Sequence, residues 1–79
     1  MGASHVRRPI ARWRYVVELW AGGRWREAGD VEAADAAAAV AEAAGEPGTY
    51  RARPEGAPPG SARLFRVQLS GRPVPIERL

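Results

Sequence analysis

The 79-residue sequence has no cysteine, which excludes disulfides and thiolate metal sites. It also has no lysine, so all 12 basic residues are arginine. No apolar run approaches the roughly 20 residues that a membrane helix requires. The N-terminal residues lack the apolar stretch of a secretory signal. We therefore expect a soluble cytoplasmic (intracellular) protein that makes no membrane contact.

Composition predicts a folded domain with a small positive charge. Hydrophobic residues make up 46% of the chain, charged residues 27%, and the formal net charge is +3. Asparagine is absent as well as lysine, and both have AT-rich codons, whereas Arg, Ala, Gly and Pro have GC-rich ones. A GC-rich genome is therefore an alternative explanation of the basic excess. We expect a flexible basic arm (1–10), one α+β domain (11–70) and an extended, proline-containing tail (71–79).

A β-hairpin is predicted at the start of the domain. Apolar and aromatic residues alternate over 12–20, which is typical of a strand. Gly22 and Gly23 then indicate a turn before a second strand at 24–28. A two-residue turn would put Arg24 and Arg26 on the side of Leu19. Because burying unpaired guanidinium groups is costly, a three-residue loop is favoured, with Trp25 beside Leu19.

A helix is predicted over 32–44, where alanine, the best helix former, predominates. Gly29 and Asp30 are expected to end the hairpin. One helix face would pack on the sheet, and the opposite face would be acidic and solvated. The expected core face holds Ala33, Ala37, Val40, Ala41 and Ala44. The expected solvated face holds Glu32, Asp35, Ala39 and Glu42.

Two more strands are expected after the helix, over 48–53 and 62–70, joined by a Pro- and Gly-rich loop at 54–61. The tail is too rich in proline for a central strand and is expected along an edge or against a partner. The predicted fold class is α+β, with β-β-α-β-β order and an antiparallel sheet that carries a single helix packed on one face. The aromatic residues are expected to fill the core.

The predicted strand and helix faces separate the charges: arginines lie on the open side of the sheet, and acidic residues lie on the helix side. Guanidinium groups bind phosphates, and Trp20 could stack on a base. The best hypothesis is thus a non-catalytic accessory or regulatory module that contacts nucleic acid. Its candidate anion-binding residues are Arg12, Arg14, Trp20, Arg24, Arg26, Arg51, Arg53 and Arg66. The alternative is a purely structural role, in which the aliphatic parts of these side chains cover the sheet and their charged ends point into water.

The second hypothesis is a protein-interaction adaptor or structural subunit, for example of a viral or mobile-element assembly, acting through a sheet edge, the hairpin tip or the tail. A homo-oligomer that pairs arginines with the acidic helix is a third. No catalytic residue, metal or cofactor is predicted, because His5 is the single histidine and no serine has a base beside it. A helix that packs on a small sheet through alanine leaves little volume for a pocket between them, so no small-molecule substrate is expected.

Overall fold

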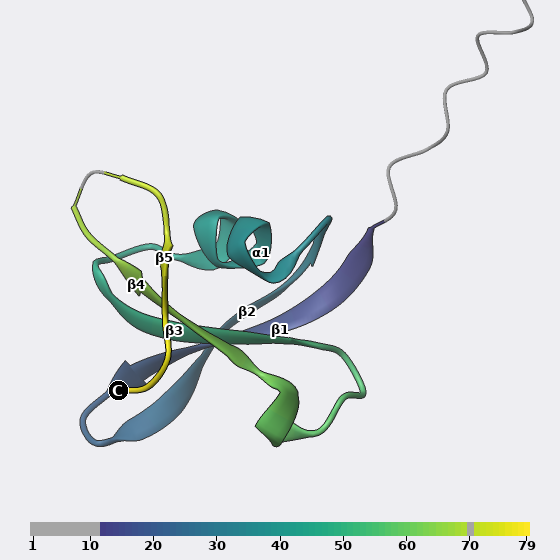
Figure 1. Ribbon diagram of the computed structural model, residues 1–79, viewed down its shortest axis with the longest axis horizontal. Coiled ribbons are helices and arrows are strands. Elements are labelled where there is room, and N and C mark those ends of the chain that lie inside the picture. The colour runs from purple at the N-terminus through teal and green to yellow at the C-terminus, as the bar shows by residue number, and fades with distance from the viewer. Residues whose placement is uncertain (1–11, 70) are drawn as a thin grey trace, which may run out of the picture.

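The computed structural model describes residues 12–69 and 71–79, and shows one antiparallel sheet with a single α-helix on one face (Figure 1). The sheet order is β2-β1-β3-β4-β5. The elements are β1 (Trp13–Ala21), β2 (Arg24–Ala33), α1 (Ala36–Ala43), β3 (Gly48–Pro54), the 3₁₀ turn η2 (Pro59–Ser61), β4 (Arg63–Val67) and β5 (Val74–Ile76). The expected β-β-α-β-β layout is confirmed, and a short fifth strand follows it.

The hairpin turn has two residues, so the expected three-residue loop is wrong. Gly22 and Gly23 have φ angles of 63° and 78°, as a two-residue turn with positive φ at both positions requires. Trp20 therefore pairs with Trp25 on the face away from α1. Trp25 is not in the core, and Trp13 is also 53% exposed.

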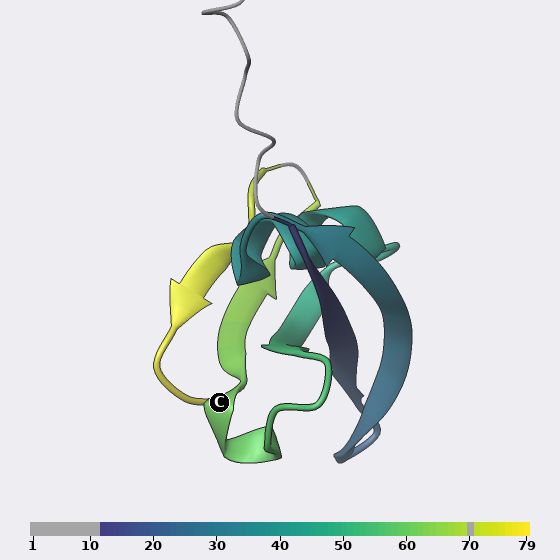
Figure 2. The ribbon, with the colours of Figure 1, turned by 90° about the vertical axis from the view of Figure 1, so that its right-hand side faces the viewer.

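This pairing does not bury unpaired guanidinium groups, because Arg24 and Arg26 remain exposed to solvent. Arg24 and Arg26 lie on the side of Leu19, as a two-residue turn dictates, yet both are exposed. The hairpin tip lies away from α1 in both views (Figures 1 and 2). The prediction assumed that the whole inner face of the sheet is buried.

A β-bulge then restores the inward face of β2. Val17 pairs with Gly29 and Glu18 pairs with Glu27, which leaves Ala28 as the extra residue. The bulge shifts the alternation, and Ala33 consequently becomes buried beneath α1. β2 thus continues well beyond Gly29, where the sequence predicted the hairpin to end.

α1 begins at Ala36 rather than at residue 32. Asp35 is its N-cap, and its Oδ1 accepts a hydrogen bond of 2.8 Å from the amide of Ala38. Glu32 and Asp30, which were expected beside the helix, lie in β2 instead.

The core is formed by α1 and the inner face of the sheet. Val17, Val40 and Tyr50 are its largest fully buried side chains. Ala39 is fully buried and Ala41 is exposed, the reverse of the expectation. The assumed helix included Ala33, a strand residue, and thereby rotated the predicted apolar stripe. The other buried residues are Tyr15, Ala33, Ala52 and Phe65.

The last strands are shorter than expected. β4 ends at Val67, and Leu69, which lies within the strand expected over 62–70, is 91% exposed. β5 pairs with β4 at the edge of the sheet and has Pro75 at its centre. Proline lacks an amide N–H and is found at such edges.

Candidate interaction surfaces

The outer face, defined as the side of the sheet opposite α1, brings together five of the predicted site residues. They are Arg14, Trp20, Arg51, Arg53 and Arg66. Carboxylates share this face: Glu27, Asp30 and Glu32 lie opposite Glu18, Val16 and Arg14 respectively. The outer face therefore carries as many acids as arginines, and the expected separation of an arginine face from an acidic helix side is wrong.

The other predicted site residues lie elsewhere. Arg24 and Arg26 are at the hairpin tip on the helix side of the sheet. Arg12 precedes β1 and lines a hollow with Glu32 and Glu42. These three arginines therefore do not add to the positive charge of the outer face.

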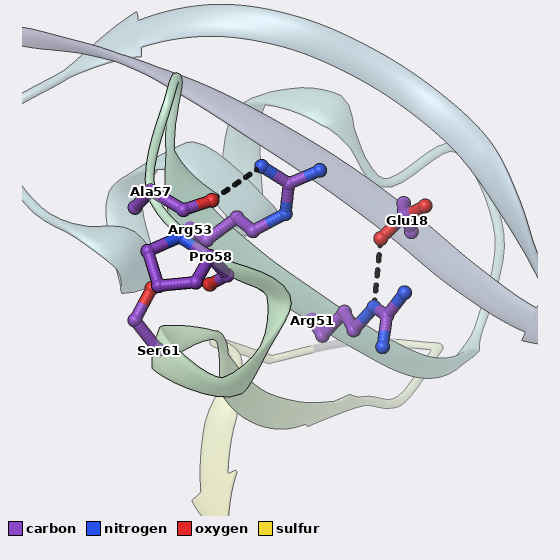
Figure 3. Close-up of polar contacts among 6 residues, drawn as sticks. All are labelled: Glu18, Arg51, Arg53, Ala57, Pro58 and Ser61. Carbon is purple, nitrogen blue, oxygen red and sulfur yellow. Dashed lines mark hydrogen bonds and ion pairs between the residues drawn. The ribbon is translucent and has the colours of Figure 1, made fainter.

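A cluster around Arg51 occupies the middle of the outer face. Its Nε donates a hydrogen bond of 2.7 Å to Oε1 of Glu18, and both side chains are about one-fifth exposed, 22% and 20% (Figure 3). The same guanidinium group lies 4.4 Å from the ring centroid of Trp25. Trp25 in turn meets Trp20 edge-on, with ring centroids 5.1 Å apart. The Arg51 charge and one face of the Trp25 ring are thus engaged within the chain.

Arg53 and Arg14 also have partners in the protein. Nη1 of Arg53 donates 2.9 Å to the carbonyl of Ala57 and holds the loop between β3 and β4 (Figure 3). Its Nε is buried without a hydrogen-bond partner. Arg14 forms a looser ion pair with Glu32, at 3.7 Å, between two well-exposed side chains. Of the predicted outer-face arginines, Arg66 alone has no such contact within the described ranges.

A second surface, which the sequence reasoning missed, follows β4 and β5. We call it the basic edge and define it by Arg63, Arg66, Arg72 and Arg78. All are exposed, and none forms an ion pair in the part of the chain that the structure describes. The signal was present in the sequence, because Glu77 is the sole acid over residues 63–79.

Apolar side chains are exposed on the same strands and loops. Leu69 is 91% exposed, Val74 54% and Leu79 59%. At the other side of the sheet, β2 carries Glu27, Asp30 and Glu32. Beyond Arg24 and Arg26 at the hairpin tip, β2 thus carries only acidic charges, whereas the opposite side of the sheet carries the arginines of the basic edge.

A groove lies on the helix side next to the basic edge, contrary to the expectation of little room for a pocket. It has a volume of about 600 Å³. The helix is short, and at this end it presents only the small side chains of Ala36 and Ala37 to the groove. Its lining includes Tyr15, Ala37, Ala57, Arg63, Phe65 and Pro75.

No protein family, no curated protein and no solved structure matches this chain. Within 12–69 and 71–79, no group of three His, Cys, Asp or Glu side chains is placed to hold a metal ion. Over the same residues, no helix is long and apolar enough to cross a membrane. The candidate N-terminal arm, with His5, lies outside the described residues.

Proposed function

We propose that the protein is a non-catalytic interaction module whose basic edge binds an acidic segment of a partner protein. The observation that carries this proposal is the mixture of side chains on that edge. Exposed arginines without ionic partners alternate there with exposed Leu69, Val74 and Leu79. Arginine is enriched at protein interfaces, and exposed apolar side chains that cluster on a surface mark an interaction site.

Recognition on this edge is expected to use side chains rather than strand addition. β5 has three residues, and its central Pro75 has no N–H to donate. An added strand would gain few main-chain hydrogen bonds there. The arginines, in contrast, can form bidentate bonds with carboxylates. We therefore expect an extended partner segment in which acidic and apolar residues alternate.

Nucleic-acid binding by the outer face stays a prediction, and the geometry supports it less. The Glu18–Arg51 ion pair and the contact of Arg51 with Trp25 engage groups that would have to bind phosphate and stack on bases. Acidic side chains on the same face would also repel phosphates. Such binding would weaken steeply with salt, because it depends on counterion release.

The first test compares a charge reversal on the basic edge with a matched one elsewhere. The variant is Arg66→Glu with Arg72→Glu, and the control is Arg24→Glu with Arg26→Glu at the exposed hairpin tip. The probe is a fluorescein-labelled peptide in which Asp and Glu alternate with Phe and Leu, followed by fluorescence anisotropy. Two exposed ion pairs at about 0.5–1 kcal/mol each, replaced by repulsion, predict roughly a tenfold or greater loss of affinity.

The control pair should retain the affinity of the unmodified protein within about twofold. A labelled single-stranded oligonucleotide, measured at low and physiological salt, serves as the competing probe. Equal losses in both double variants would contradict a specific basic edge. Tighter, steeply salt-dependent binding of the oligonucleotide would replace the proposal with the nucleic-acid hypothesis.

A further inference from the structure

We infer that the groove beside the basic edge is an anchor site for one large apolar side chain, phenylalanine or leucine, of the acidic partner segment. This inference rests on the proposed function and names how the segment is held. The buried side chains of Tyr15 and Phe65 line the groove together with Ala52. Ala37 of α1 and Ala57 of the β3–β4 loop also line it. A mostly apolar lining favours binding of an apolar side chain, because it offers few hydrogen-bond partners to a polar one.

A neighbouring hollow favours an extended chain over a compact ligand as the occupant of the groove. A second hollow is lined by Leu64, Ile76 and Glu77. It shares Arg63, Phe65 and Pro75 with the groove, so the two hollows adjoin at β4 and β5. A peptide that places one side chain in the groove would therefore run along the second hollow toward the basic edge.

Charge fixes which way the segment's carboxylates face. Arg63 lines both hollows, is exposed, and has no ionic partner within the described residues. The other charged group of the groove is Asp35, whose Oδ1 already accepts the amide of Ala38 at the start of α1. A carboxylate next to the anchoring side chain is attracted by Arg63 and repelled by Asp35. The acidic neighbour of the anchor is thus expected on the β4 side, away from α1.

The test fills the groove without changing charge. Ala37→Leu lengthens a side chain in the groove lining, and Ala38→Leu makes the same change on an exposed position of the same helix that does not line it. Leucine is a good helix former, so both variants are expected to fold. With the labelled Phe-containing acidic peptide, Ala37→Leu should weaken binding about tenfold or more, and Ala38→Leu by less than twofold.

A second peptide, with its Phe residues replaced by Ala, separates the anchor from the charges. It should bind the unmodified protein weakly and should be insensitive to Ala37→Leu. Near-ultraviolet circular dichroism checks the fold, and Ala57→Leu on the loop replaces Ala37→Leu if the helix variant does not fold. Amide chemical shifts on peptide addition should include Ala36, Ala37 and Phe65.

The outcomes distinguish the anchor from the basic edge. Unchanged binding by the groove-filled variants, with affinity still lost in Arg66→Glu with Arg72→Glu, overturns the anchor and leaves the proposed function standing. No binding of any acidic peptide overturns both. Binding of 3-phenylpropionate as tight as that of the peptide assigns the groove to a small aromatic acid and overturns the peptide as its occupant.

Discussion

Replacing Arg51 with Met tests whether the outer-face cluster stabilises the fold. Glu18 lies between two cross-strand neighbours, Arg51 on β3 and Glu27 on β2. Arg51→Met preserves apolar contact with Trp25 but leaves Glu18 facing a like charge, which is unfavourable. The lost pair is about four-fifths buried, and its guanidinium also contacts a ring. A charge-assisted hydrogen bond at about 1.5 kcal/mol and a cation–π contact at about 0.5 kcal/mol give an expected loss of about 2 kcal/mol.

The assay is a double-mutant cycle in urea, followed by tryptophan fluorescence. Glu18→Gln, Arg51→Met and the double variant should give a coupling free energy of about 1 to 1.5 kcal/mol, and Arg51→Met should lower Tm by roughly 10 °C. The matched control is the cycle of Glu32→Gln with Arg14→Met, whose ion pair is longer and more exposed, and whose coupling should be below about 0.5 kcal/mol. A Glu18–Arg51 coupling no larger than that of the control would refute the reasoning.

Two further predictions concern local structure. Asp35→Ala should lower the free energy of unfolding by about 1 kcal/mol because it removes the helix cap, whereas Glu42→Ala should be nearly neutral; equal urea midpoints for the two variants would contradict the cap. Gly22→Asn should be tolerated or raise stability by up to about 0.5 kcal/mol, because asparagine accepts positive φ, and Gly22→Val should lower it. A thermal melt in which Gly22→Val matches the unmodified protein would contradict the two-residue turn.

The order of elements could be predicted because each local signal is strong. Alternation over β1, the paired glycines and the alanine-rich helix each specify one kind of structure. The register of β2 could not be predicted, because it depends on where α1 covers the sheet. Burial of Arg24 and Arg26 was assumed, and the tertiary fold leaves both in water.

The candidate site was harder to predict because the face of a strand residue changes at a bulge. No sequence pattern marks Ala28 as an extra residue. The sequence also predicted Asp30 and Glu32 at the start of the helix, whereas β2 continues through both. Paired arginines are also invisible in the sequence: Arg51 looks as available as Arg66. The basic edge, in contrast, was predictable from residues 63–79, which carry many arginines and one acid.

The extra residue in β2 has a consequence for engineering this protein. It divides the strand into a part beneath α1, where Ala33 must stay small, and a tip where Arg24 and Arg26 face open water on the same side. Exchanging one tip residue for another should leave the packing under the helix undisturbed. Deleting Ala28 would remove the bulge, but Gly29 and Asp30 could keep their partners Val17 and Val16, so Asp30 and Glu32 would stay on the outer face. The hairpin tip is therefore a site for grafting a new recognition sequence, provided that the number of residues is kept.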